Sequence, residues 1–515
     1  MSLDEQKSRK ASDKVRQACE YCRSRKIRCN NHNPCPNCQR INLPCVYQIP
    51  KKKGPRRREA VQEIPRSVPS EPSKSPGYDI TVSPEPSTAS FQPSSLLSLE
   101  TFQSCLDSFF TNKYPVMPIL DRDATYASLH QLHDSPTQYS LITSLCAVIM
   151  MQTEISVPTD KEGSLDKSHQ FDSMLAVDFL IKETYRAREC CDQIESPSLA
   201  SVQSSFFLFS CLSQMGKDNS AWVHLRESIT MLQLLGLHEE TSYSTMSDPC
   251  YATFSRRTFW LLFITEQAYA LQRHRPLTLR RPIDLPVIED GHEAAIIYGF
   301  LDSIDLFRNF GDGFMSLWNY TERDSPHPVS PRPFIKLQEF LKDVIPNVSE
   351  RSEIQQADLL ITRQWLKMIV WQLCLKKGML SSNPITDSMS FHYPVDIARD
   401  VTLVARLLPL EAFQANGVGI LGKIFDIGCS LADVLLVHPH ILHTSTIEVG
   451  PKDYLMDLVR ILDMDIRGHS RYLLLLANRA DECLGVRIPS TLSAGNGSPA
   501  VYSDEVHGSP RSSSI

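Results

Sequence analysis

Six cysteines between residues 19 and 45 constrain the fold of this chain more than any other feature. They follow the pattern Cys-x2-Cys-x6-Cys-x5-Cys-x2-Cys-x6-Cys, at Cys19, Cys22, Cys29, Cys35, Cys38 and Cys45. The last three repeat the first three at a constant offset of sixteen residues, which predicts two similar half-units related by a pseudo-twofold axis. The N-terminus has no apolar stretch typical of a signal peptide, so we expect an intracellular chain whose clustered cysteines bind metal.

The number of thiolates predicts how the metal is held. A structural zinc ion takes four ligands in a tetrahedron, so six thiolates satisfy two zinc ions only if two thiolates bridge both. Symmetry points to the first cysteine of each half, Cys19 and Cys35, as the bridging pair. The alternatives are one zinc with two spare thiols, or a mixed site that uses His32. The repeated spacing favours two zinc ions, and His32 has no counterpart in the other half.

The charge of the chain is divided unevenly. Residues 1–60 contain 16 Lys and Arg against 5 Asp and Glu, although the whole chain has a net charge of -6. The first half of the cysteine pattern contains Arg23, Arg25, Lys26 and Arg28, whereas the matching stretch of the second half contains only Arg40. We therefore expect the first half to face a polyanion and the second half mainly to complete the fold.

The residues of this segment resemble the fungal binuclear zinc cluster, or Zn2Cys6, transcription factors. The resemblance rests on Ala18–Cys29, Pro34–Cys38 and Leu43–Tyr47. It implies that a short helix after the second cysteine enters the major groove of duplex DNA and reads a CGG-type triplet. By position, Arg25 and Lys26 would contact bases, and Arg23 and Arg28 would contact phosphates. Arginine or lysine bound to guanine is the commonest specific base contact.

Two basic triplets follow the cysteines: Lys51, Lys52 and Lys53, then Arg56, Arg57 and Arg58. They predict a nuclear localisation signal, and the lysines are also expected to contact phosphates. The next residues, to about position 98, are rich in Pro and Ser and are expected to stay disordered. Their prolines leave no room for a coiled coil. The sequence therefore allows either a monomer or a homodimer that pairs through the C-terminal region.

From about residue 98 to 487 the apolar residues recur at helical spacing. The clearest expected helices are Leu180–Arg188, Ala221–Leu237, Ser255–Gln272, Ile354–Lys376, Val401–Phe413, Ile420–Leu436 and Tyr454–Ile466. Phe259, Trp260, Phe263 and Trp222 are expected in the core, and the arginines of the Arg256-Arg257 pair in ion pairs. We expect roughly a dozen helices in all.

Ala221–His238 and Arg256–Pro286 resemble the regulatory, or middle homology, domain that accompanies this zinc cluster in fungal factors. The predicted fold class is thus a small binuclear zinc cluster DNA-binding module and a large all-α regulatory domain, joined by a disordered linker. The predicted boundaries are a disordered arm at 1–14, the cluster at 15–47, the linker at 48–97, the helical domain at 98–487 and a disordered tail at 488–515.

These features predict a nuclear transcription factor that regulates RNA polymerase II transcription in a fungus. Its expected partners are duplex DNA with CGG-type half-sites and the transcription machinery or its co-regulators. The resemblance implies an activator, of either maltose-type sugar use or a secondary-metabolite gene cluster. No phosphate-binding loop or nucleophile motif indicates an enzyme, and no apolar run is long enough to span a membrane. The rival hypothesis is a zinc-knuckle protein that binds RNA. Such knuckles use one metal ion and aromatic stacking, whereas the expected reading helix mainly offers positive charge.

Overall fold

The computed structural model describes residues 18–30, 32–41, 45–47, 91–152, 169–280, 283–289, 291, 293–319, 330–384, 386–438, 449–463 and 471–485. The predicted arm at 1–14, both basic triplets, the linker up to residue 90 and the tail at 488–515 lie outside these residues. The chain divides into two compact units, Met1–Ser87 and Thr88–Ile515, which we describe separately.

The first unit contains two short helices, α1 (Glu20–Ser24) and α2 (Pro36–Arg40). Each begins directly after the first cysteine of its half, and each carries the second cysteine in its first turn. Cys35 caps α2, because its sulfur accepts a hydrogen bond from the backbone N–H of Cys38, and Pro36 occupies the first helical position. The repeat seen in the sequence is therefore also a repeat of backbone structure.

The second unit is built from helices, and the described residues contain no strand, which confirms the predicted all-α class. Its first helices are α3 (Leu99–Ser108), the π-helix η1 (Phe109–Lys113), α4 (Arg122–Ser128), η2 (Leu129–Gln131), α5 (Pro136–Met150), α6 (His169–Glu189), α7 (Leu199–Gln214), α8 (Asp218–Leu234), α9 (Glu240–Tyr243) and α10 (Pro249–Arg273). They are followed by α11 (Ala294–Phe307), α12 (Asp312–Asn319), α13 (Arg332–Asp343), η4 (Val348–Glu350), α14 (Glu353–Lys376), η5 (Asp387–Met389), α15 (Tyr393–Leu407), α16 (Leu410–Asn416), α17 (Val418–Val437), α18 (Pro451–Asp463) and α19 (Arg471–Leu484).

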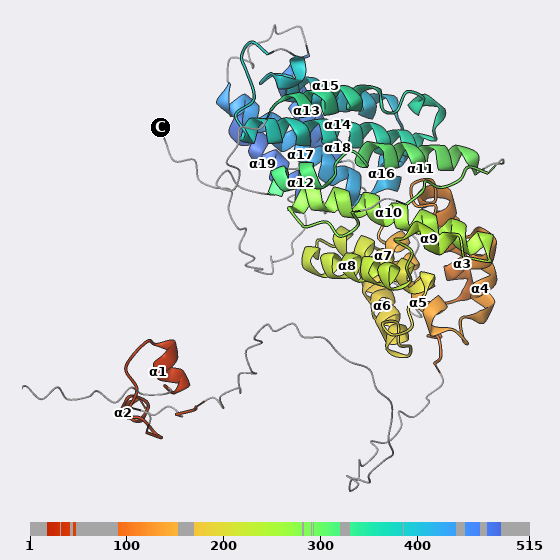
Figure 1. The fold of residues 1–515 in the computed structure, drawn as a ribbon, viewed down its shortest axis with the longest axis vertical. Helices are drawn as coiled ribbons and strands as arrows, with labels where there is room; N and C mark the ends of the chain where they lie inside the picture. Colours follow the sequence, from red (N-terminus) through yellow and green to blue (C-terminus); the bar gives the residue numbers. More distant parts are fainter. Residues whose placement is uncertain are drawn as a thin grey trace, which may run out of the picture. The chain divides into compact units, whose positions relative to one another are not determined.

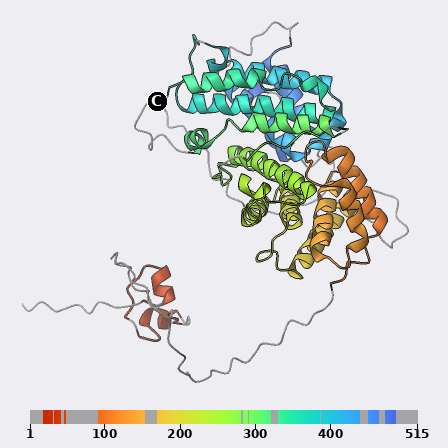
Figure 2. The same cartoon turned by 45° about the vertical axis from the view of Figure 1, so that its right-hand side comes forward.

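The helices of the second unit form two groups that α10 joins (Figure 1). In the first group α5 packs against α6 and α7, and α7 packs against α8. In the second group α14 packs against α11, α13, α15, α16 and α17, while α18 and α19 cover α17. The view in Figure 2 shows α10 between the two groups, and its contacts with α7, α8 and α11 agree with that position.

A single hydrophobic core runs through both groups. Phe259, Trp260 and Phe263 of α10 are buried, as predicted, whereas Trp222 is half-buried and stacks on Tyr269 with ring centroids 5.6 Å apart. The predicted ion pairs of the double arginine are also present. Arg256 pairs with Glu240 at 2.7 Å and Arg257 with Glu293 at 3.2 Å. No described helix is both long and apolar enough to cross a bilayer.

The prediction of one helix over Val401–Phe413 is wrong. The structure has two helices there, because α15 ends at Leu407 and α16 begins at Leu410. Leu408 is extended, with φ -107° and ψ 148°, as expected for a residue that precedes proline. Pro409 lacks the N–H that a continuous helix needs at that position. Short helices such as α4, α9 and α16 raise the number of α-helices in this unit above the dozen expected.

Candidate metal centre

The six cysteines meet in two overlapping groups of four. One group contains Cys19, Cys22, Cys29 and Cys35, and the other contains Cys19, Cys35, Cys38 and Cys45. Within each group the sulfur atoms lie within 4.8 Å of one another. All six are buried except Cys45, which is half-buried. Only Cys19 and Cys35 belong to both groups, which is the arrangement that the count of ligands requires of a bridging pair.

The distances between the sulfur atoms fit zinc. The Cys19 sulfur lies 3.7 Å from that of Cys35 and 3.6 Å from that of Cys38. The sulfurs of Cys22 and Cys35 are 3.6 Å apart, and those of Cys29 and Cys19 are 3.9 Å apart. A zinc–sulfur bond of about 2.3 Å in a regular tetrahedron places its sulfurs about 3.8 Å apart. The residues present therefore suit two zinc ions, and their assignment as ligands stays a prediction.

A backbone N–H group favours the thiolate form of Cys35, whereas the pKa values of Cys19, Cys22 and Cys38 are raised. The N–H of Cys38 donates to the Cys35 sulfur at 3.5 Å, and the N–H of Cys35 donates to the Cys45 sulfur at 3.3 Å. The hydrogen bond from Cys38 lowers the pKa of the Cys35 thiol to about 6. Burial raises the pKa of Cys22, and the side chain of Asn37 acts in the opposite direction. The thiolate is the form that binds a metal ion.

Two supporting residues were not predicted from the sequence. Asn37 Nδ2 lies 3.5 Å from the Cys22 sulfur and donates to the Arg28 carbonyl at 2.9 Å, so it ties the second half to the first. Tyr47 Oη lies 3.5 Å from the Cys29 sulfur and donates to the His32 carbonyl at 3.0 Å. The role of Asn37 could have been suspected from its position between the two cysteines of a Cys-x2-Cys turn, where a side-chain amide can reach a sulfur. His32 thus contributes a backbone group here.

The end of α1 has an unusual backbone. The N–H of Ile27 bonds to the Cys22 carbonyl at 3.0 Å and the N–H of Lys26 to the Arg23 carbonyl at 3.2 Å. These two bonds form a Schellman motif, which ends a helix with one residue in the left-handed conformation. Lys26 occupies that place with φ 54°, where glycine is usual. The chain therefore turns sharply at Lys26, and Arg25 and Lys26 lie just beyond the last residue of the helix.

The predicted DNA-contacting side chains of the first half are exposed. Arg23 lies in the last turn of α1, Arg25 and Lys26 follow it, and Arg28 precedes Cys29. The helix spans the second cysteine instead of following it, so the basic pair lies at its C-terminal end, where the helix dipole favours cations. In the second half, Arg40 is the basic residue that the structure describes. The lysines at 51–53 lie outside the described residues.

Comparison with known proteins agrees with this geometry. Residues 17–54 match the family described as "Fungal Zn(2)-Cys(6) binuclear cluster domain", and residues 106–373 match the "Fungal specific transcription factor domain". The chain belongs to the fungal Zn2Cys6 transcription factors. It is therefore a DNA-binding regulator of transcription, and its N-terminal cluster is a zinc-binding domain.

Several curated Zn2Cys6 relatives are similar over most of their length. The probable sucrose utilization protein SUC1 of Candida albicans is 26% identical over 433 residues, which is 81% of this chain and 78% of the relative. The maltose fermentation regulatory protein MAL13 of Saccharomyces cerevisiae is 21% identical over 433 residues, 83% of this chain and 85% of the relative. The respiratory transcription factor ZNF1 of the same yeast is 24% identical over 426 residues, 82% of this chain and 85% of the relative.

Proposed function

We propose that this protein is a nuclear activator of sugar-utilisation genes that reads CGG-type triplets in the major groove through Arg25 and Lys26. Two zinc ions, bound by the six cysteines and bridged by Cys19 and Cys35, stabilise the conformation of α1 and of the residues Arg25 and Lys26 that follow it. The observation that carries the proposal is the pair of exposed basic side chains at the end of α1, next to a helix whose Cys22 is buried in the cysteine cluster.

The geometry of the α1 end supports base reading by these two side chains. The left-handed conformation of Lys26 turns the chain away from the axis of α1. The adjacent Arg25 keeps a helical backbone, with φ -85° and ψ -1°. Two neighbouring cations on a tightly bent backbone suit the paired acceptors of consecutive guanines. Arg23 and Arg28 lie on either side in the sequence and would bind phosphates. Lys51, Lys52 and Lys53 would extend the phosphate contacts.

The pathway is proposed from the relatives. Several have printed names that refer to sucrose utilization or maltose fermentation, and each covers about four-fifths of this chain. The rival pathway, a single secondary-metabolite gene cluster, shares the same DNA-binding chemistry and becomes an outcome of the experiment below. The zinc is structural in either case, because four thiolates around each ion leave no place for a reacting water. We therefore propose no enzymatic activity.

We also propose a domain organisation for the chain. Residues 15–47 form the DNA-binding module, 48–97 the linker and 98–487 the regulatory domain, flanked by segments 1–14 and 488–515. Residues 91–97 already touch the helical unit, since Phe91 packs edge-on against Tyr139 with centroids 5.2 Å apart. The basic triplets, Lys51–Lys53 and Arg56–Arg58, direct the protein to the nucleus. Any homodimer forms through the helical domain.

The experiment that tests this function is genome-wide mapping of DNA bound by the tagged protein in sugar-grown and metabolite-producing cultures. Peaks with CGG half-sites upstream of glycosidase and sugar-transporter genes are expected. Peaks confined to one biosynthetic gene cluster would contradict the proposed sugar pathway, but they would not contradict the proposed base contacts of Arg25 and Lys26. Peaks without CGG enrichment would overturn the roles of Arg25 and Lys26.

A further inference from the structure

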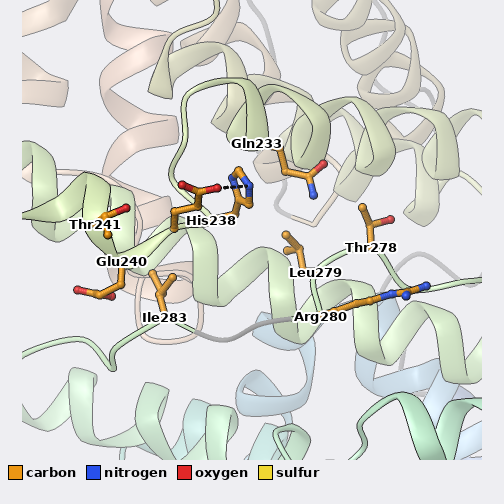
Figure 3. Close-up of a pocket in the computed structure, with 9 residues that line it drawn as sticks. Gln233, His238, Glu240, Thr241, Thr278, Leu279, Arg280 and Ile283 are labelled. Carbon is orange, nitrogen blue, oxygen red and sulfur yellow. Dashed lines mark ion pairs between the residues drawn. The ribbon is translucent and has the colours of Figure 1, made fainter. Parts of the chain in front are cut away.

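A cavity of about 570 Å³ lies on the helical unit where two segments that are distant in the sequence meet (Figure 3). One wall comes from the end of α8 and from α9, with Gln233, His238 and Thr241. The other wall comes from the residues after α10, with Thr278, Leu279 and Arg280. Its volume falls in the range of small-molecule sites, about 300–1,000 Å³.

The wall after α10 is fixed in place at two points. At the first, the fully buried carboxylate of Glu266 accepts hydrogen bonds from the N–H groups of Thr278 and Leu279, both at 2.9 Å, and from Arg226 at 3.0 Å. A buried carboxylate needs such partners to be tolerated. These bonds place the side chains of Thr278 and Leu279 at the cavity before any ligand arrives.

The second point is Asp284. Its N–H donates to Glu240 Oε2 at 2.8 Å, and its carbonyl accepts from Trp260 Nε1 and from Arg256 Nη1, both at 3.0 Å. Because Glu240 belongs to α9, this point joins the two walls directly. The cavity is therefore held open by hydrogen bonds that are buried or partly buried at Glu266 and partly exposed at Asp284, which is the preformed state typical of ligand sites.

The side chains around the cavity keep unused hydrogen-bonding capacity. In the part of the chain that the structure describes, the hydroxyl group of Thr241 and the side-chain amide of Gln233 have no hydrogen-bond partner, whereas the hydroxyl group of Thr278 bonds to the carboxylate of Glu266. His238 Nδ1 is shielded from solvent and also lacks one. Hydroxyl and amide groups both donate and accept, so they match a ligand that itself presents both donors and acceptors.

The charges of the cavity nearly cancel. Glu240 is neutralised by Arg256, whose two nitrogens each lie 2.7 Å from a carboxylate oxygen. Glu239 lies 3.6 Å from His238, and Arg280 lies 3.9 Å from Asp312. With Arg256 and Asp312 counted, these groups sum to one negative charge when His238 is neutral, so the cavity has no positive excess to attract an anion. Leu279 and Ile283 add apolar surface that suits the C–H face of a saturated ring.

We propose that this cavity binds a neutral, hydroxyl-rich ligand of one or two sugar rings. A ligand held there contacts both α9 and the residues after α10, so it would strengthen the junction that Glu240 and Asp284 make between the two walls. The inference rests on the proposed sugar-linked function only for the choice of probe. It does not depend on how the protein reads DNA.

The test is isothermal titration of the zinc-loaded full chain with maltose, with sucrose and with glucose 6-phosphate as an anionic comparison. Saturable binding of maltose or sucrose, tighter than that of the anion, is expected. The double variant Gln233→Met with Thr241→Val should weaken that binding by about tenfold or more, because both hydrogen-bonding groups are lost. Thr230→Val is the matched control, since Thr230 is exposed on α8 and bonds only to its own helix.

Each other outcome contradicts the proposal. Absence of saturable binding by both sugars, tighter binding of the anion, or equal weakening by Thr230→Val would each overturn it. Thermal unfolding of the same variants shows whether they fold. DNA binding is measured in parallel on CGG duplexes, so a failure of DNA reading is seen separately from a failure of sugar binding.

Discussion

The sulfur atoms of Cys19 and Cys35 lie 3.7 Å apart, and these two residues are shared by both four-cysteine groups of the described chain. Each is the residue that immediately precedes a short helix, so both helices begin at the shared pair. In the proposed arrangement with two zinc ions, loss of one shared thiolate would remove a ligand from both ions at once. Each of the other four cysteines would bind one ion.

The change Cys19→Ala is therefore expected to release both zinc ions and unfold residues 15–47. Structural zinc supplies on the order of 10–16 kcal/mol in small zinc domains, and this module has little other core. Zinc content by mass spectrometry and binding to CGG duplexes measure the effect. The control is Cys190→Ala, an exposed cysteine of the helical unit, which should retain both ions. A Cys19→Ala protein that keeps two zinc ions would contradict the shared-ligand arrangement.

Lys26 offers a test that separates backbone from side chain. Its left-handed conformation costs a non-glycine residue about 1 kcal/mol, so Lys26→Gly should stabilise the zinc-loaded module by about that amount. The same change removes a proposed base contact and should lower discrimination for CGG by about 1–3 kcal/mol. Lys26→Ala should lose the discrimination without the gain in stability.

Thermal unfolding and competition between CGG and altered duplexes give the two readouts for Lys26. Equal stability of the glycine and alanine variants would contradict the backbone argument. Unchanged discrimination in both would contradict the base contact.

Arg28 is expected to act on phosphate. Arg28→Gln should weaken binding to all duplex sequences by a similar factor and reduce the slope of log affinity against log salt by about 1. Arg25→Gln should instead weaken binding mainly to CGG. Affinities measured at several salt concentrations on matched and mismatched duplexes compare the two variants. If Arg28→Gln weakened binding to CGG duplexes much more than to mismatched duplexes, Arg28 would be a base-reading residue and its assignment to phosphate would be wrong.

The helical unit carries a predicted pH dependence at Asp426. Burial raises the pKa of this carboxyl group to about 6, and Trp365 Nε1 donates to its Oδ2 at 3.0 Å. In the unfolded chain the carboxyl group of Asp426 loses its proton near pH 4, whereas in the folded protein it keeps the proton up to about pH 6. The group therefore costs stability progressively from about pH 4 to 6, and the cost stays constant above that, on the order of 2–3 kcal/mol.

Asp426→Asn keeps an acceptor for Trp365 and removes the charge. It should raise the thermal midpoint of the helical unit at pH 7.5 and lose that advantage at pH 4. Asp463→Asn, at an exposed position of α18, serves as the control and should change neither. A variant that is less stable than the wild type at pH 7.5 would show that the ionised carboxylate contributes favourably there.

Much of this organisation was predictable, because it depends on local patterns. The spacing of the six cysteines predicted the shared pair, and helical periodicity predicted α8, α10, α14 and α17 to within a few residues at most ends. The break between α15 and α16 was missed although Pro409 marks it, since the apolar period continues across the proline.

Other features depend on contacts between distant residues. Nothing in the local sequence places Lys26 in a left-handed conformation, because the usual residue there is glycine. The cavity arises only when Glu266 binds the residues after α10 and when Glu240 reaches Asp284. Buried carboxylates with backbone partners cannot be paired from periodicity alone.

The most direct test of DNA reading by the zinc cluster is selection of bound sites from a random duplex library by the purified, zinc-loaded full chain. Base reading by Arg25 and Lys26 predicts strong enrichment of CGG triplets, which is lost when both residues are replaced by alanine and is kept in Arg40→Ala. Enrichment of an unrelated sequence, or CGG enrichment that survives the double replacement, would contradict it.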